Sequence, residues 1–496
     1  MTEFAIPPHF EDLLEADKGY YVVGPSSGLH RSSAEVVHEA VEGILLQLES
    51  DPWALASPEL FDTLFHLVYR FSVLDDTVKA AVVDLLVGTV QKFVVAWQSG
   101  AKMPEPPANI FTVSSRSVLK QYVFLLHMLI MVVEKDGSGM SLAAAGGKKK
   151  KKSKAKSYSW SGKVPFVVAA FSAVLVDVSP ALYTRLWNMP LPEEEFITAI
   201  SRSLFLLFES HTTFKALPST CVDTIHAIFK VLIVSYRRGM AASTSIMHLL
   251  HNHEHLPGPL AQLLGAIAAP EPSAASADAG DDDDEAHKPA GEDESAAADD
   301  SGAASNEVRA LVEDILRDIG KTSPQQLAVD SAGTKNLAAF LVALAETVPR
   351  LALSSVAVLI HHLEGEAYIM RNAIISMMGH CVAGPLKNGN PATRDAFLDH
   401  LMARLYDATS YVRSRTLQTW SIIVEARALP LARLHALSKA AVGRLADKAS
   451  IVRRSAIGLL KELLLNNPFA GQLRLDVFEA KRASLESRHA ELVALV

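Results

Sequence analysis

The sequence predicts an all-α protein built from stacked helix pairs, and three observations support this. A ten-residue motif that begins at Asp407 returns 40 residues later at Asp447, with Asp, Ser, a large apolar residue, Val, Arg and a small residue at the same places. Amphipathic segments flank both copies, and the chain shows no convincing run of alternating β-branched residues. A period of about 40 residues made of paired helices is typical of an α-α superhelix, the HEAT/armadillo-type solenoid. Solenoids of this kind bind other macromolecules along a long surface, so we expect a scaffold.

Composition agrees with a helical interior. Apolar residues make up 49% of the 496 residues and aromatic residues only 7%, so Ala, Leu and Val supply most of the core. Two cysteines, Cys221 and Cys381, exclude a disulfide framework and fit a reducing compartment. The apolar stretch Val123–Val133 is shorter than the roughly 20 residues that a membrane span needs, so it predicts a buried helix. We therefore expect a soluble intracellular protein without membrane contact.

Helical periodicity covers most of the chain. Near the N-terminus, Ser33 is a suitable N-cap for a helix that runs through Leu45. Further helices are predicted at 57–76, 78–98, Val113–Glu134, Lys163–Trp187, Glu193–Glu209, Ser219–Ser235 and Ala241–His251. From Val308 the pattern becomes regular, with Leu337–Val348, then Ala352–Leu363 paired with Ala367–Val382, Arg394–Tyr406 with Tyr411–Val424, and Leu431–Ala446 with Ile451–Leu465.

Two low-complexity segments interrupt this pattern. One holds seven Lys and no acidic residue between positions 148 and 156, and the other holds twelve Asp or Glu against one Lys between 271 and 306. Neither can bury enough apolar area to fold, so both are predicted to be disordered. The predicted organisation is an N-terminal helical domain (1–135), a Lys-rich loop (136–162), the second part of that domain (163–267), an acidic linker (268–306) and HEAT repeats truncated at the C-terminus (307–496).

The repeated motif itself suggests a structural role. Asp407 and Asp447 each close a first helix, and Arg413 and Arg453 each open a second helix, so they can bond across neighbouring repeats and fix the register of stacking. The alternative is that the arginines bind a phosphate backbone. We favour the structural role because these residues recur with the repeat.

The lysine run has three possible interpretations. It could be a nuclear-localisation signal, a loop that binds nucleic acid, or a solvated spacer. Without interleaved aromatic residues it lacks the stacking platforms of single-strand binders, although it could release counterions from a duplex. The run comprises Lys148, Lys149, Lys150, Lys151 and Lys152, followed by Lys154 and Lys156.

Signals for metal binding and catalysis are weak. His248, His251, His253 and His255 cluster near a helix end, but no Cys or further carboxylate completes a zinc-like spacing. Histidines at a helix C-terminus also interact favourably with the helix dipole, which is the interpretation we favour. The chain contains no phosphate-binding loop, dinucleotide fingerprint, zinc-protease or nucleophile-elbow motif. We therefore expect no enzyme, no catalytic residue, no metal and no cofactor.

Several stretches resemble one family. They are Gly333–Glu346 followed by Pro349, Glu366–Ala373 with Gly379, Tyr411–Thr416, Lys448–Ile457 and Leu464–Phe469, supported upstream by Leu186-Trp187 and Glu193–Phe196. Together they resemble the condensin complex subunit 1 family, the D2-type HEAT-repeat subunits, along most of residues 30–480. Members of that family are much longer, and this chain stops inside a helical segment, so we expect a fragment or a truncated gene model. In the repeat at Tyr368–Arg371 the small residue also follows the arginine one position earlier than in the later copies.

The resemblance implies a non-SMC regulatory subunit of condensin that acts in mitotic chromosome condensation. It implies binding to the kleisin subunit and to the SMC ATPase heads, contact with DNA, and ATP hydrolysis by the SMC partners. It also implies a location in the nucleus and on mitotic chromosomes, with a cytoplasmic pool, and no small-molecule substrate. The alternatives are the related subunit of the second condensin complex, another HEAT-repeat adaptor or transport scaffold, and, more distantly, a metal- or nucleotide-dependent enzyme.

The expected partner surface is the groove formed by the repeats at 337–469, through docking of an extended peptide. The residues proposed for partner or DNA contact are Arg371, Arg413, Arg415, Arg453 and Arg454, with Lys148–Lys152 as an auxiliary loop. Asp407 and Asp447 are the residues proposed for repeat stacking.

Overall fold

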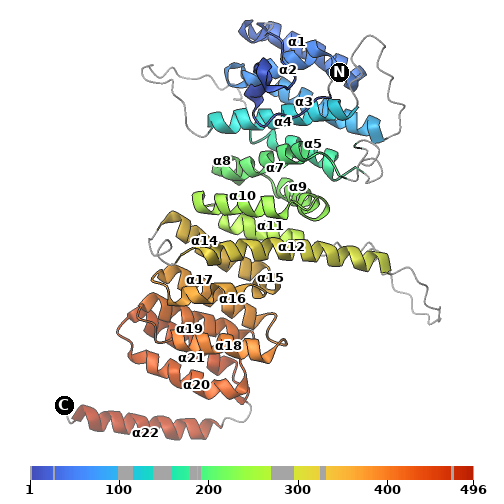
Figure 1. Ribbon diagram of the computed structural model, residues 1–496. Coiled ribbons are helices and arrows are strands. Elements are labelled where there is room, and N and C mark those ends of the chain that lie inside the picture. Colours follow the sequence, from blue (N-terminus) through green and yellow to red (C-terminus); the bar gives the residue numbers. More distant parts are fainter. Residues whose placement is uncertain are drawn as a thin grey trace, which may run out of the picture. The chain divides into compact units, whose positions relative to one another are not determined.

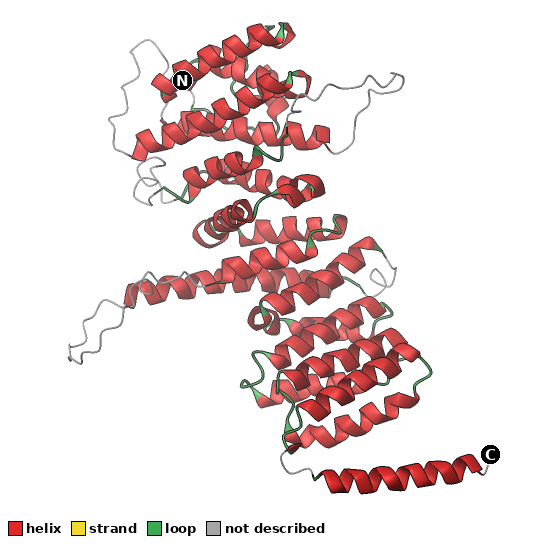
Figure 2. Ribbon diagram, turned by 180° about the vertical axis from the view of Figure 1, so that it is seen from behind, coloured by secondary structure: helices red, strands yellow, loops and turns green. Residues whose placement is uncertain are grey.

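A computed structural model describes residues 3–25, 28–98, 115–137, 159–178, 187, 191–269, 295–323, 331–470 and 474–494. Within these ranges every regular element is a helix and none is a strand (Figure 2). The predicted all-α solenoid class is confirmed. The lysine run Lys148–Lys152, Lys154 and Lys156, as well as most of the acidic linker, lies outside the described residues.

The chain divides into two compact units. Unit 1 comprises Met1–Leu249 and Ala266–Leu311, and unit 2 comprises Leu250–Gly265 and Val312–Val496. These limits pass through helices α10 (Gly239–Asn252), α11 (Pro257–Ala268) and α12 (Ser295–Lys321), so each of these helices contributes to both units. The domain limits expected from the sequence stay a prediction.

Unit 1 is built around the apolar helix α4 (Ser115–Gly137). Its Leu119, Tyr122 and Leu126 are fully buried, and the helix packs against α2 (Pro58–Tyr69) and α7 (Glu194–Glu209). Arg116–Lys135 is long and apolar enough to cross a membrane, but 78% of its most apolar window is buried inside the fold. This burial is typical of the core helix that the sequence predicted. The other helices of the unit are α1 (Ala34–Ser50), α3 (Asp76–Gln98), α5 (Val164–Leu175), α8 (His211–Ala216) and α9 (Ser219–Lys230).

The irregular N-terminal segment is anchored to this core. Phe4 is buried and meets Phe61 and Phe124 edge-on, with ring centroids 5.3 Å and 5.8 Å away. Lys120, whose side chain is 3% exposed, bridges Glu3 at 3.0 Å and Glu193 at 2.5 Å. Because both carboxylates meet one buried ammonium group, this contact ties residues far apart in sequence to α4.

Unit 2 consists of stacked helix pairs (Figure 1). Its first helices are α18 (Pro391–Arg404) and α20 (Leu431–Gly443), and its second helices are α17 (Tyr368–Ala383), α19 (Ser410–Glu425) and α21 (Ser450–Leu465). Helix α14 (Ala332–Thr347) packs on α17, α17 on α19, and α19 on α21. A Cβ atom added at Gly379 in α17 would lie 2.2 Å from the side chain of Thr419, so glycine permits this close approach.

Three sequence expectations need correction in detail. The predicted helix Ala352–Leu363 is broken into α15 (Pro349–Leu353), α16 (Val356–Leu359) and a 3₁₀ turn, because Ser354 and Ser355 interrupt it. Helix α5 ends at Leu175, before the predicted limit at Trp187. Helix α12 begins at Ser295, inside the range assigned to the acidic linker, where an alanine-rich stretch favours helix.

The last helix, α22 (Leu475–Ala494), contains no buried residue. It contrasts with α21, whose Val452, Ala456 and Leu459 are buried against the stack.

Candidate partner-binding surface

Three arginines of unit 2 occupy the same place in successive helix pairs. Arg371, Arg413 and Arg453 lie in the first turn of α17, α19 and α21. The Nη1 group of each one donates hydrogen bonds to two carbonyl oxygens of the loop that precedes its own helix. For Arg413 the acceptors are Asp407 O at 2.8 Å and Ala408 O at 3.0 Å. For Arg453 they are Asp447 O at 2.8 Å and Lys448 O at 3.0 Å.

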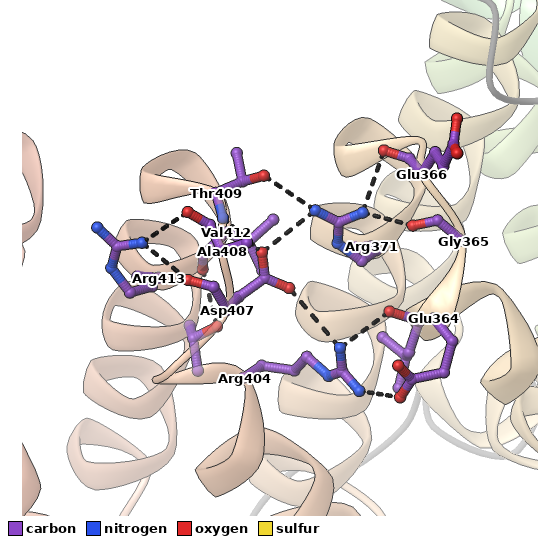
Figure 3. A network of polar contacts seen from close by, with 12 residues as sticks. Glu364, Gly365, Glu366, Arg371, Arg404, Asp407, Ala408, Thr409, Val412 and Arg413 are labelled. Atoms are coloured by element: carbon purple, nitrogen blue, oxygen red, sulfur yellow. Dashed lines mark hydrogen bonds and ion pairs between the residues drawn. The ribbon is translucent and has the colours of Figure 1, made fainter.

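Two of these arginines also bind an aspartate of the next helix pair, through the guanidinium nitrogens that the loop carbonyls leave free. Arg413 donates from Nε and Nη2 to both carboxylate oxygens of Asp447, at 2.8 Å and 2.9 Å. Arg371 donates from Nη2 to Asp407 Oδ1 at 3.2 Å and to Thr409 Oγ1 at 3.1 Å (Figure 3). Arg413 thus matches its carboxylate through two parallel donors, which adds geometric specificity to the charge attraction, whereas Arg371 reaches Asp407 through Nη2 alone. Each arginine therefore joins its own loop to the next one.

The aspartates are also held from their own side. Asp407 Oδ1 accepts from the backbone N of Thr409 at 2.8 Å, and Asp447 Oδ1 accepts from the backbone N of Ala449 at 3.0 Å. Such Asx turns shape the start of the following helix. At the end of the first helices, Arg404 lies 3.7 Å from Asp407 and Arg444 lies 3.1 Å from Asp447. Both carboxylates are thus buried with two arginines each.

This environment keeps the Asp447 carboxyl ionised. The hydrogen bond from Arg413, followed by the backbone bond from Ala449, lowers the pKa of Asp447 to about 2. The same pairing raises the pKa of Arg413. The loops at 364–368, 406–411 and 445–451, joined by these contacts, form what we call the loop edge of unit 2.

Three tyrosine rings lie along the loop edge, and Tyr368 among them is half-buried. Tyr368 and Tyr411 stack with ring centroids 5.6 Å apart and planes inclined by 28°. The guanidinium group of Arg444 lies 4.5 Å from the ring centroid of Tyr406. Tyr406 and Tyr411 are both exposed. Tyrosine at an exposed surface supplies contact area and a hydroxyl group, which is typical of binding surfaces.

The structure separates the arginines that the sequence grouped together. Arg371 and Arg413 are engaged by aspartates inside the stack. Arg415 and Arg454 are exposed, and no ion pair links either one to an acidic residue within the described ranges. Arg453 is exposed, and within the described ranges its only hydrogen bonds are to two loop carbonyl oxygens. The auxiliary lysines lie outside the described part of the chain, so their role stays a prediction.

Sequence reasoning missed two members of the network, Arg404 and Arg444. They precede Asp407 and Asp447 by three residues, and they share the 40-residue spacing of the repeated motif. Aligning the two copies of the repeated motif over a few more residues on the N-terminal side reveals both arginines, because they are 40 residues apart in the sequence.

Within the described ranges, no group of three or more His, Cys, Asp or Glu side chains is placed to hold a metal ion. His253 and His255 lie with their rings 5.8 Å apart, which does not complete a ligand set. Burial raises the pKa of the Cys381 thiol to about 12 and that of Cys221 to about 11, so both thiols stay protonated near neutrality. The absence of metal, cofactor and catalytic residues stays a prediction.

Comparison with known proteins finds similarity to one family. Residues 76–242 match the family model described as non-SMC mitotic condensation complex subunit 1, N-term. Condensin complex subunit 1 of Homo sapiens is 35% identical over 58% of this chain and 18% of its own length. That of Xenopus laevis is 28% identical over 95% of this chain and 32% of its own length. Condensin-1 complex subunit CAP-D2 of Arabidopsis thaliana is 26% identical over 92% of this chain and 30% of its own length.

The chain therefore spans about a fifth to a third of the length of these relatives. Among solved structures, Kap121p is 12% identical, with 88% of this chain and 46% of that chain covered and a TM-score of 0.28, a likeness too distant to bear on function. The family resemblance seen in the sequence is confirmed. This chain is similar to condensin complex subunit 1 along most of its length, and its residues 76–242 match the N-terminal family model of that subunit.

Proposed function

We propose that this chain is a non-SMC scaffold subunit of a condensin complex and acts in mitotic chromosome condensation. The observation that carries the proposal is the similarity to condensin complex subunit 1 of Xenopus laevis along 95% of the chain. The proposed partners are the kleisin subunit and the SMC ATPase heads, with ATP hydrolysis on the SMC partners. The protein itself is not an enzyme and acts by binding. Its proposed location is the nucleus and mitotic chromosomes, with a cytoplasmic pool.

The repeats at 337–469 are the proposed surface for kleisin. Val424, Leu434 and Leu463 line a hollow of about 410 Å³ near the ends of α19, α20 and α21, and the exposed Leu431 and Leu465 lie at the same place. The leucines of this lining can contact apolar side chains of an extended peptide, while Arg427, Asn466 and Asn467 in the same lining offer groups for main-chain hydrogen bonds. These features support peptide docking in this part of unit 2.

DNA contact is proposed for Arg415, Arg453 and Arg454, with Lys148–Lys152 as an auxiliary loop. Exposed arginines without an acidic neighbour can neutralise phosphates and release counterions. Arg371 and Arg413 are better suited to joining neighbouring helix pairs, because each already forms an ion pair with an aspartate. The proposed DNA surface is thus narrower than the one expected from the sequence.

The test is a pull-down of purified residues 1–496 against the kleisin chain of the same condensin complex, with a small GTPase as control bait. Selective retention of kleisin supports the condensin function. Retention of the GTPase would favour a transport scaffold, and retention of only the kleisin of the second condensin complex would assign the chain to that assembly. A folded, helical sample that retains none of these proteins contradicts the proposal for this chain.

The location of the contact can be tested with one substitution and one matched control. Leu465→Asp places a charge at an exposed position in the lining of the hollow and should abolish kleisin retention, with helicity measured to confirm folding. Leu485→Asp introduces the same charge in α22, where Leu485 is exposed and no residue is buried. It should leave retention unchanged. Equal loss with both variants would argue against the hollow as the docking site.

A further inference from the structure

A cavity of about 260 Å³ lies in unit 1, where helices α4 and α7 meet the N-terminal segment. The buried part of its lining is apolar and includes Ile6, Pro7 and Ala199. The charged side chains of Glu195 and Arg202 in α7 also border it and are exposed, so the cavity is open to solvent. An apolar cavity with a few polar groups at its edge is the usual form of a binding site.

The wall that the N-terminal segment supplies is held from both ends. Ahead of its cavity-lining residues, Glu3 accepts a hydrogen bond from Nζ of Lys120 at 3.0 Å. Beyond them, Asp62 accepts hydrogen bonds from the Tyr21 hydroxyl group and from the backbone N of Gly24, each at 2.9 Å. A wall fixed in this way needs little further ordering when a ligand enters, which lowers the entropic cost of binding.

His127 of α4 gives the cavity a hydrogen-bond acceptor. Its Nδ1 atom lies 2.8 Å from Oγ of Ser203, and that hydroxyl group donates its own proton to the carbonyl oxygen of Ala199, also at 2.8 Å. Nδ1 therefore carries the ring proton, which leaves a lone pair on Nε2. Burial, followed by the charge of Arg202, lowers the pKa of His127 to about 4, so the ring is neutral at physiological pH. Nε2 has no hydrogen-bond partner among the described residues.

The charges at the opening favour a neutral ligand group. Arg202 makes one long hydrogen bond, from Nη1 to the carbonyl oxygen of Pro8 at 3.5 Å, so it keeps donors for a ligand. Glu195 forms no ion pair with a described residue. A phosphate or carboxylate group would meet Glu195 and the Nε2 lone pair of His127, and an ammonium group would meet Arg202. A neutral group that both donates and accepts a hydrogen bond fits this edge best.

We propose that this cavity binds a tyrosine side chain of a partner protein. The phenol hydroxyl group would donate to Nε2 of His127 and accept from Arg202, so one group serves both. The ring would cover the apolar lining at Ile6, Pro7 and Ala199. An indole N–H donates but cannot accept, and a serine or threonine side chain is too small to cover this lining. The proposal gives unit 1 a contact of its own, beyond the kleisin, SMC and DNA contacts proposed above.

The probe is N-acetyl-L-tyrosinamide, titrated against the full chain and followed by saturation-transfer difference NMR. Saturable binding with a Kd of about 1 mM is expected for a ligand of this size. N-acetyl-L-phenylalaninamide lacks the hydroxyl group and should bind about tenfold more weakly, because His127 and Arg202 then lose their partner. Arg202→Met removes the donor, keeps an apolar stem of similar length, and should weaken binding of the tyrosine probe about fivefold. Arg237→Met is the matched control, since the side chain of Arg237 is 81% exposed and does not line the cavity.

A comparison of both probes on a His127→Leu chain completes the test. This variant removes the acceptor, so the tyrosine and phenylalanine probes should bind to it with affinities that differ by less than about twofold. A variant that had lost its fold would bind neither probe, which separates a folding defect from the loss of the acceptor. Equal affinity of the two probes for the wild-type chain, or equal weakening by Arg202→Met and Arg237→Met, overturns the proposal. So does tighter binding of N-acetyl-L-tryptophanamide, or no saturable binding of the tyrosine probe up to about 20 mM.

Discussion

Replacing Arg413 by glutamine tests whether the arginine–aspartate contacts hold the helix pairs together. The substitution removes two bonds to Asp447, at 2.8 Å and 2.9 Å, and two bonds to loop carbonyls. The pKa of Asp447 is lowered from 3.8 to about 2, which corresponds to roughly 2 kcal/mol of stabilisation of the ionised carboxylate. Arg444 and the backbone N of Ala449 contribute part of this, and they remain in the variant. We therefore expect a loss of about 2 kcal/mol in the stability of the α19–α21 contact.

Hydrogen exchange measured by mass spectrometry suits this prediction, because it reports local opening. A loss of about 2 kcal/mol should speed exchange of protected amides in α19 and α21 by about 30-fold. Unit 1 should be unaffected. Arg415→Gln is the control, since Arg415 is exposed in the same helix and makes no ion pair with a described residue. Exchange that is unchanged in Arg413→Gln, or equally fast in both variants, would refute the reasoning.

Three further predictions follow from the packing and the charges. The folded-state pKa of Asp447 is depressed, so its contribution to stability is present above its ordinary pKa of 3.8 and is lost as pH falls toward about 2, which exchange or circular dichroism between pH 5 and about 2 would reveal. Gly379→Ala should lower stability by about 1–3 kcal/mol because its Cβ would meet Thr419 at 2.2 Å, whereas Gly458→Ala, with nothing within 4 Å, should be neutral or stabilising in thermal unfolding. Lys120→Met should destabilise unit 1 by about 1–3 kcal/mol in urea unfolding, because two carboxylates would lose their buried partner.

The helices were predictable where apolar periodicity was strong and uninterrupted. The predicted helices Tyr411–Val424 and Ile451–Leu465 differ from α19 and α21 by at most one residue at either end. Ala352–Leu363 was wrong as one helix because its apolar pattern continued across a turn at Ser354 and Ser355, and the backbone leaves helical geometry at Ser355. Periodicity reports burial and not backbone continuity, so such breaks escape it.

The candidate site was only partly predictable. The residues of the repeated motif could be read from the sequence, but the division between engaged and exposed arginines could not. That division depends on which side of the helix faces the next pair: Arg413 points at Asp447, while Arg415, two residues later, is exposed. Arg404 and Arg444 could have been found from their spacing, whereas the tyrosine stack needed the spatial neighbourhood of two loops.

The spacing of the arginine and aspartate contacts has a consequence for gene rearrangement. Asp407 and Asp447 occur at the same phase of the 40-residue unit. Loss of one whole unit that starts at Asp407 would bring Asp447 into the register of Asp407, and Arg371 would again meet a carboxylate. Loss of a different length would rotate the aspartate away from the upstream arginine and leave charge buried. These contacts therefore favour deletions and duplications of whole 40-residue repeats, because only such changes keep each aspartate beside the arginine of the preceding repeat.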